Sequence, residues 1–345
     1  MFNSKTGGPQ SGEELPMKAV VYTRYGEPFV LQVREIARPV PSDHEVLIKV
    51  HAATVNRTDL ATIKAKPFFM RAFTGLLKPK KQTPGTEFAG RVEAVGRAVT
   101  SFKVGDSVFG FDDQGSGSQA EYMTISEEQG LIIMPADVTY AQAAASTEGT
   151  HYAYNFNNKV NTKSGQEVLV NGATGAIGSA AVQLLKSFGL RVTAVCGTSG
   201  TELIQSLGAD RVIDYTREDF TRTKDRYDFV FDTVGKSSFF KCRRLLKPGG
   251  VYISSDLGFL AQNVFLPMIT PIIRPMTGNR TTRFPTPKNV KETLVLVKGL
   301  IEEGRFRAVI DREYPLERIV DAYKYVETGQ KIGSVVVTIR PDSQA

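Results

Sequence analysis

The stretch VLVNGATGAIGSAAVQLLK, residues 168–186, decides the fold. It begins with an apolar run typical of a buried strand, turns through glycines, and continues with apolar residues at helical spacing up to Leu185. This order matches the dinucleotide-binding fingerprint, in which a pyrophosphate lies on the helix N-terminus. Gly175 then lets the backbone approach the phosphates, and Gly178 lets the helix pack closely on the strand. A tight turn without a ligand is the alternative, but the context favours a dinucleotide site.

Strands and helices alternate along the chain from residue 141 onward. Apolar runs predict strands at 168–173, 191–196, 211–215, 229–235 and 251–256, and the segments between them predict helices that include 201–207 and 238–246. Continuous apolar strands separated by helices indicate a parallel sheet that is covered on both faces. We therefore predict a doubly wound Rossmann domain over residues 135–287.

The segment 17–134 has a different pattern, with short strands and frequent turn residues. Strands are predicted at 17–23, 45–53, 88–96, 107–111 and 121–126, which favours a small barrel or folded sheet. After two helices at 289–304 and 316–328, the strand 334–339 returns to this pattern. We expect 17–134 and 288–345 to form one β-rich domain, with 1–16 as a disordered lead-in that lacks the apolar core of a signal peptide.

The chain has 345 residues, enough for about two domains. Its 43 basic and 36 acidic residues give a net charge of +7, which suits anionic partners such as nucleotide phosphates. We find no nucleic-acid-binding motif. The only cysteines, Cys196 and Cys242, allow one disulfide at most, so we expect a reducing, cytoplasmic location.

The most apolar segment, residues 258–276, contains three prolines and Arg274. These residues oppose a membrane-spanning helix. We expect a buried loop or broken helix here, while a lid, an interface or a peripheral membrane contact over 258–283 stays open. A second segment, 63–82, mixes cations with phenylalanines, and its alternatives are the basic rim of an apolar substrate pocket, a solvated basic loop, or a surface that binds nucleic acid or a membrane.

Several motifs together resemble one family. They are MKAVVY, TVNRTDL, PGTEFAGRVEAVG, FKVGDSVFGF, VLVNGATGAIG, LGADRVIDY and LLKPGGVYI. The chain is similar to the medium-chain dehydrogenase/reductase superfamily, in its zinc-free, quinone-oxidoreductase-like branch. The resemblance implies an α/β fold with a GroES-like catalytic domain beside a Rossmann domain. It also implies hydride transfer from NAD(P)H in the cleft between them, and commonly a homodimer.

The end of the second Rossmann strand, VCGTSGTE, indicates the cofactor. NAD sites usually place an acid here for the ribose hydroxyl, whereas Thr198 and Ser199 suit a 2′-phosphate. NADPH is therefore favoured over NADH, although no Arg or Lys follows the strand at once. The resemblance implies that Tyr215 contacts the adenosine phosphate. The predicted cofactor-binding residues are Asn56, Thr174, Gly175, Ala176, Ile177, Gly178, Thr198, Ser199, Tyr215 and Gly235.

The resemblance also identifies the positions that hold zinc in metal-dependent relatives. Here they carry Asn56, Thr86 and Glu148 in place of cysteine and histidine. Zinc prefers Cys, His or carboxylate ligands, so we predict a site without metal. Without a Lewis acid, hydrogen bonds must polarise the substrate, which suits quinones and α,β-unsaturated carbonyls.

Three residues are candidates for catalysis. Asn56 is expected to donate its amide to the substrate carbonyl or the nicotinamide ribose, with capping of the strand turn as the alternative. His151 and Glu148 are three residues apart, so on a helix they would share one face, with His151 as proton donor and Glu148 orienting it. Their alternative is a purely structural role. Asp59 is expected to hold backbone N–H groups at a helix start.

Two other functions compete with a zinc-independent, NADPH-dependent reductase. One is an NADPH-binding regulatory or membrane-associated protein with little turnover. The other is a zinc-free alcohol or aldehyde oxidoreductase, which is disfavoured because removing an alcohol proton without metal help needs a strong base.

Overall fold

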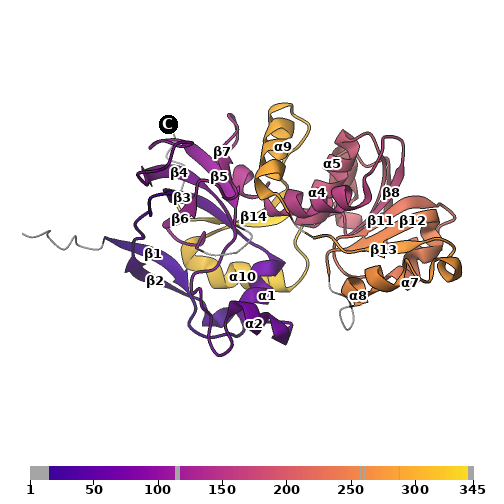
Figure 1. The fold of residues 1–345 in the computed structure, drawn as a ribbon, viewed down its shortest axis with the longest axis horizontal. Helices are drawn as coiled ribbons and strands as arrows, with labels where there is room; N and C mark the ends of the chain where they lie inside the picture. The colour runs from indigo at the N-terminus through magenta and orange to yellow at the C-terminus, as the bar shows by residue number, and fades with distance from the viewer. Residues whose placement is uncertain (1–14, 113–116, 257, 259–261, 287, 341–345) are drawn as a thin grey trace, which may run out of the picture.

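The computed structural model describes residues 15–112, 117–256, 258, 262–286 and 288–340. Two β-sheets lie side by side along the long axis of the molecule, and helix α4 (Glu148–Val160) lies between them (Figure 1). The predicted α/β class is confirmed.

The first sheet has seven strands in the order β14-β15-β3-β4-β5-β7, with β6 also pairing with β3. Their bounds are β3 (Glu45–Val55), β4 (Glu87–Val95), β5 (Ser107–Phe111), β6 (Tyr122–Ser126), β7 (Leu131–Ile133), β14 (Ile310–Pro315) and β15 (Ser334–Thr338). The strands β1 (Pro16–Val21) and β2 (Gln32–Ala37) form a separate antiparallel pair. Because β15 pairs with β3 across Val335 and Val55, the last strand of the chain lies in the same sheet as strands from its N-terminal third.

The second sheet has six strands, and all of its strand pairs are parallel. The order is β10-β9-β8-β11-β12-β13, with β8 (Glu167–Asn171), β9 (Arg191–Cys196), β10 (Arg211–Asp214), β11 (Tyr227–Asp232), β12 (Leu246–Ser254) and β13 (Thr281–Arg283). The direction of winding reverses between β8 and β11. In such sheets a ligand lies beyond the carboxyl ends of the strands at this reversal point.

Successive residues of each central strand enter different cores. Val168 and Val170 of β8 pack in one cluster, while Leu169 between them packs in another. This explains why the strands are apolar throughout: both faces of the sheet are covered. The first cluster also contains Phe109 of the first sheet and Leu294 of α9 (Val290–Glu302), so one continuous core joins the two halves and fixes α4 between them.

The remaining helices are short. They are α1 (Arg57–Lys64), α2 (Arg71–Thr74), α3 (Tyr140–Ala144), α5 (Ala176–Ser187), α6 (Thr201–Ser206), α7 (Phe239–Cys242), α8 (Gln262–Ile269) and α10 (Ile319–Glu327). The segment 63–82 forms the end of α1, a 3-10 turn (Phe68–Met70) and α2. In the described part of the chain, no helix combines the length and apolar character that crossing a bilayer requires.

One prediction of local structure was wrong and one held only in part. The helix expected over 238–246 ends at Cys242, and after a 3-10 turn β12 begins at Leu246, because buried Leu245 and Leu246 lead into the sheet and Pro248 cannot continue a helix. The apolar segment 258–276 contains a broken helix, one of the two expected forms, and within it Asn263 and Thr270 are buried while several apolar side chains are not. Met268, Ile272 and Met276 are 72%, 79% and 81% exposed.

Candidate active site

The glycine loop after β8 has the geometry of a phosphate cradle. A Cβ on Gly178 would lie 2.2 Å from the Gly172 carbonyl oxygen, so only glycine lets α5 approach the strand this closely. A Cβ on Gly175 would meet only the Gly172 oxygen, at 3.6 Å, which leaves open space above the N-terminus of α5. Thr174, Ala176 and Ile177 complete the loop. The residues present therefore fit a dinucleotide pyrophosphate.

The adenosine end of such a nucleotide would lie over β9 and β10. A Cβ on Gly197 would lie 3.3 Å from the Tyr215 hydroxyl, so the exposed tyrosine ring lies against the glycine after β9. Thr198 and Ser199 are exposed beside it. The Thr198 hydroxyl, however, donates to the Asp214 carboxylate at 2.6 Å, so its hydrogen is already engaged. The predicted role of Thr198 as a phosphate donor stays untested, and the structure makes Ser199 the better-placed hydroxyl of the two.

The nicotinamide end would lie over β11, where Gly235 follows the strand with φ +66°. Buried Asp232 fixes this turn, because its carboxylate accepts hydrogen bonds from the backbone N–H groups of Gly235, at 3.1 Å, and Ser237, at 3.0 Å. The Tyr252 hydroxyl and the Asn171 amide also donate to Asp232. Its role in shaping the turn was not predicted from the sequence.

The first sheet supplies the opposite wall of this junction. Asn56 ends β3 and precedes α1, and its amide nitrogen lies 2.7 Å from Glu148 Oε2 and 3.1 Å from Thr54 Oγ1, with Glu87 Oε2 also in hydrogen-bond contact. Asp59 accepts the Asn56 backbone N–H at 2.8 Å, as predicted. An amide has two hydrogens, so those of Asn56 are taken up by these acceptors. The expected contact between Asn56 and a substrate stays a prediction. In this structure the Asn56 amide donates its hydrogen bonds to the carboxyl groups of Glu148 and Glu87.

Glu87 and Glu148 are buried side by side, yet their surroundings differ. The Glu87 carboxylate accepts from four donors: the Thr147 hydroxyl and Glu148 N–H on one oxygen, and Thr54 and Asn56 on the other. These four bonds use both oxygens of Glu87 and fix its side chain. Glu148 accepts mainly from Asn56 and from the Thr58 hydroxyl, which lies 2.7 Å from Oε1.

Burial therefore raises the pKa of Glu148 to about 8, and the charges of Glu87 and Asp59 add to the effect. Burial likewise raises the pKa of Asp59 to about 7. Glu148 is thus a neutral acid at pH 7. Because Thr58 is exposed, its hydroxyl connects this buried acid to the open side of the junction.

The last loop of the chain closes the junction. The Gly333 backbone N–H donates to the Thr174 carbonyl oxygen at 2.6 Å, joining the loop before β15 to the glycine loop after β8. Lys331 in the same loop lowers the pKa of Glu148 through its charge. Arg57 reaches across from α1, with Nη1 at 3.4 Å from the Val234 carbonyl oxygen.

His151 does not lie in this carboxylate cluster. Its Nδ1 is 3.1 Å from the Thr293 hydroxyl of α9, its ring lies 5.5 Å from that of Phe111, and it is only 1% exposed. The described partners of Glu148 are Asn56, Thr58 and Thr86. The predicted acid–base pair of His151 and Glu148 stays untested, and the structure gives Glu148 a different hydroxyl partner, Thr58.

The donor set at the position of the zinc site in related enzymes does not suit zinc. Asn56 and Thr86 are neutral amide and hydroxyl groups, and the raised pKa of Glu148 favours its protonated form, which is a weak ligand. Among the residues that the structure describes, no group of three or more His, Cys, Asp or Glu side chains is arranged to hold a metal ion.

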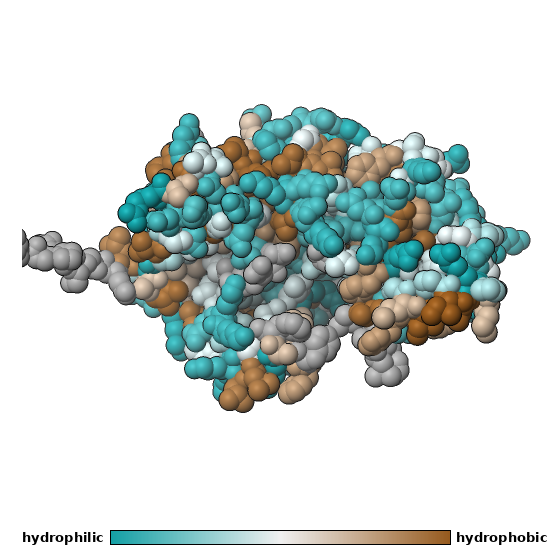
Figure 2. All heavy atoms as spheres, viewed as in Figure 1, coloured by the Kyte–Doolittle hydropathy of each residue, from teal (hydrophilic) through white to brown (hydrophobic). Residues whose placement is uncertain are grey.

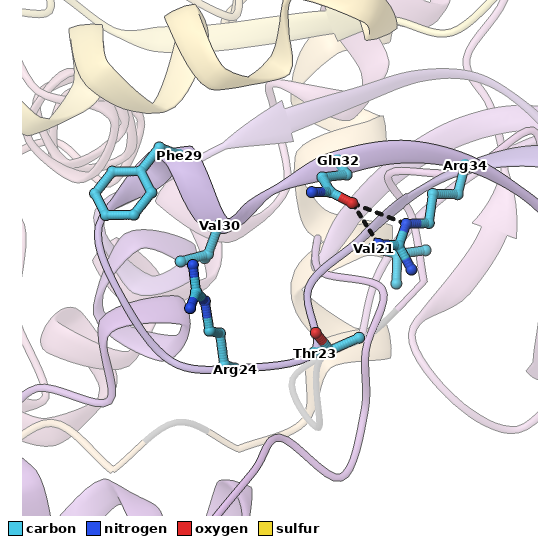
Figure 3. Close-up of a pocket in the computed structure, with 7 residues that line it drawn as sticks. All are labelled: Val21, Thr23, Arg24, Phe29, Val30, Gln32 and Arg34. Atoms are coloured by element: carbon cyan, nitrogen blue, oxygen red, sulfur yellow. Dashed lines mark hydrogen bonds between the residues drawn. The ribbon is translucent and has the colours of Figure 1, made fainter.

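A hollow of about 260 Å³ lies elsewhere, on the β1–β2 pair, and is lined by Val21, Thr23, Arg24, Phe29, Val30, Gln32 and Arg34 (Figure 3). It contains none of the predicted site residues. The junction between the sheets, where Asn56, Glu148 and the glycine loop lie, is the active-site candidate.

Comparisons with known proteins agree with this architecture. Residues 42–136 match the model of the alcohol dehydrogenase GroES-like domain, and residues 207–337 match that of a zinc-binding dehydrogenase. The chain is 34% identical to a 2-methylene-furan-3-one reductase of Solanum lycopersicum over 93% of this chain and 79% of the relative. It is 32% identical to a chloroplastic NADPH-dependent alkenal/one oxidoreductase of Arabidopsis thaliana, with the same coverage.

The solved structure of a quinone oxidoreductase from Coxiella burnetii is 26% identical and superimposes with a TM-score of 0.82, covering 94% of this chain and 100% of the other. The predicted resemblance is thus confirmed. The chain belongs to the medium-chain dehydrogenase/reductase superfamily, a family of NAD(P)H oxidoreductases, in its quinone-oxidoreductase-like branch.

Proposed function

We propose that this chain is an NADPH-dependent, zinc-independent reductase of quinones or α,β-unsaturated carbonyls. The observation that carries the proposal is the buried Glu148, whose pKa burial raises to about 8, joined by the Thr58 hydroxyl to the junction that faces the phosphate loop. The names of the relatives, an enone-type reductase, an alkenal/one oxidoreductase and a quinone oxidoreductase, support the same substrate class.

The chemistry divides between the cofactor and the chain. When bound, a reduced nicotinamide supplies hydride. Adding hydride to a conjugated carbon leaves negative charge on the substrate, which then needs a proton. Thr58 can pass its proton to that charge once its 2.7 Å bond to Glu148, in which Thr58 is the donor, reverses so that the neutral acid donates its proton to Thr58 and is left as a carboxylate. Asn56 and Glu87 keep Glu148 in place through their hydrogen bonds to it, and His151 is kept as a second candidate donor.

Zinc independence rests on the donor chemistry. An amide, a hydroxyl and a neutral carboxylic acid make weak ligands, and a bound cation would have to displace the proton of Glu148. NADPH preference rests on the absence of an acid in the loop after β9 and on the NADPH-dependent relative.

We also propose a homodimer through the β13 edge. β13 is the last strand of the parallel sheet, and exposed Met268, Ile272 and Met276 lie on the chain that leads to it. Figure 2 shows a brown, hydrophobic patch at the lower right, over the region where Figure 1 places α8 and α7. Ile272→Lys should halve the mass measured by light scattering. An unchanged mass would place the interface elsewhere, and binding of the wild type to lipid vesicles would favour the membrane-associated alternative.

A cytoplasmic location is part of the proposal, because Cys196 and Cys242 are buried free thiols, which suits a reducing compartment. Cell fractionation tests it.

NADPH oxidation with a panel of quinones, enones, aldehydes and alcohols tests the activity. We expect turnover with quinones or enones, at unchanged rate after dialysis against a chelator. Measured NADPH binding without turnover on any acceptor would overturn the proposal in favour of a regulatory protein. Turnover confined to aldehydes or alcohols would favour a zinc-free alcohol or aldehyde oxidoreductase.

A further inference from the structure

The loop after β9, where the sequence places the 2′-phosphate of NADPH, contains no basic side chain. A phosphate bound to a protein usually meets an Arg or Lys. The loop after β9 offers Thr198 and Ser199 but no basic side chain before α6. The neighbouring loop after β10 does carry one, Arg217, two residues beyond Tyr215.

The two loops meet at one carboxylate. Asp214 Oδ2 accepts the Thr198 hydroxyl at 2.6 Å and lies 3.4 Å from Arg217 Nε. The hydroxyls of Thr198 and Thr216 are themselves 3.0 Å apart. Arg217 thus lies beside the residues expected to surround the adenosine ribose, on the side of the sheet where the nucleotide would end.

The Asp214 carboxylate holds Arg217, but its oxygens are already engaged and have no acceptor site left for a ribose hydroxyl. Its second oxygen accepts the Thr216 backbone N–H at 2.9 Å and the Thr216 hydroxyl at 2.7 Å. The bonds from Thr198 and Thr216 hold the pKa of Asp214 below its ordinary value, so it stays ionised. Asp214 therefore does not replace the ribose-binding acid of NAD sites. It acts as a counter-ion that orients the guanidinium.

The local surface leaves room for a ligand group. A hollow of about 340 Å³ is lined by residues 215–220, and the Arg217 side chain is 76% exposed on it. Two acids share this hollow. Asp219 is engaged by Thr221 and by Arg222, at 3.3 Å, which leaves Glu218 as the charge opposing an anion.

We propose that Arg217 is the specificity residue for the cofactor, binding the 2′-phosphate that distinguishes NADPH from NADH, with Ser199 and Tyr215 beside it. This assignment rests on the proposed function, since it takes NADPH as the cofactor. It moves the basis of cofactor choice from the loop after β9 to the loop after β10.

Binding measurements on the full chain test the assignment without relying on turnover. Calorimetry should give dissociation constants for NADPH, NADH, 2′,5′-ADP and 5′-AMP with wild type, Arg217→Gln and Arg217→Lys. Arg222→Gln is the matched control, because Arg222 is an equally exposed arginine in the same loop with the same i,i+3 ion pair to an aspartate. Circular dichroism checks that each variant folds.

We expect Arg217→Gln to weaken NADPH and 2′,5′-ADP by about 10- to 100-fold while NADH and 5′-AMP change little. Arg217→Lys should lie between, and Arg222→Gln should match wild type. Equal losses for NADPH and NADH, or no loss for either, would overturn the assignment. If the expected pattern appears but no acceptor is reduced, the proposed activity fails and the assignment of Arg217 stands.

Discussion

Replacing Glu148 by glutamine should remove a specific pH dependence of stability. Burial raises the pKa of this carboxyl from its ordinary 4.5 to about 8. Between these values the folded chain holds a proton that the unfolded chain has released, so the free energy of unfolding falls as pH rises. Glutamine keeps the shape of the neutral acid and its contacts with Thr58 and Asn56, but it does not titrate.

The magnitude follows from one proton of difference. One proton corresponds to about 1.4 kcal/mol per pH unit, so wild type should lose up to roughly 3 kcal/mol between about pH 5 and pH 7 through this group alone. Asp59, with its pKa raised to about 7, adds a slope of the same sign in both proteins, so the difference between them reports Glu148 together with its charge coupling to Asp59.

Urea unfolding followed by circular dichroism at pH 5, 6, 7 and 8 measures the effect. Glu148→Gln should gain stability relative to wild type as pH rises, and parallel curves for the two proteins would refute a protonated Glu148. Glu127→Gln is a control of opposite sign. The backbone N–H groups of Ser101 and Thr100 lower the pKa of Glu127 below its ordinary 4.5, so this variant should be less stable than wild type by a constant amount from pH 5 to pH 8, and the loss should disappear only in added measurements below pH 4.5.

Three further predictions follow from the same site. Thr58→Val should lower kcat by about 10²-fold with little change in the dissociation constant of NADPH. Thr58→Ser keeps the hydroxyl and should retain most activity. Equal activity of the two variants would remove Thr58 from the proton path. Lys331→Met should move the basic limb of the kcat–pH profile to higher pH, because the charge of Lys331 lowers the pKa of Glu148; an unmoved limb would contradict this coupling. Gly178→Ala should abolish NADPH binding and lower the melting temperature, because its Cβ would lie 2.2 Å from the Gly172 oxygen. The control Gly299→Ala, in open space on α9, should stabilise the protein by about 0.5–1 kcal/mol. A normal melting curve for Gly178→Ala would show that the loop can adjust.

The Rossmann sheet was predictable because its signals are local. Each apolar run from 168 to 256 contains enough buried residues to mark a strand, and the glycines of the phosphate loop stand at fixed distances from it. The short edge strands β2, β7 and β13 were missed. They have few residues, and their pairing depends on neighbours elsewhere in the chain.

The site was only partly predictable. Asn56 and Glu148 were identified, but Glu87, Thr58 and Lys331 were not, because they reach Glu148 only through the tertiary fold. A signal for Glu87 was present: an acid leading directly into the apolar strand FAGRVEAV predicts a buried charge that needs partners. For segment 258–276, apolar composition alone could not distinguish a buried segment from an exposed face, since both exclude charge.

Isotope transfer tests the central claim most directly. NADPH carrying deuterium at the transferable nicotinamide position would be incubated with an α,β-unsaturated ketone, and the product examined by mass spectrometry and NMR. We predict one deuterium on the β-carbon from the cofactor and a solvent-derived hydrogen on the α-carbon. A reduced product without cofactor deuterium, or none at all for enones and quinones despite bound NADPH, would contradict the assignment of this chain as a hydride-transferring reductase.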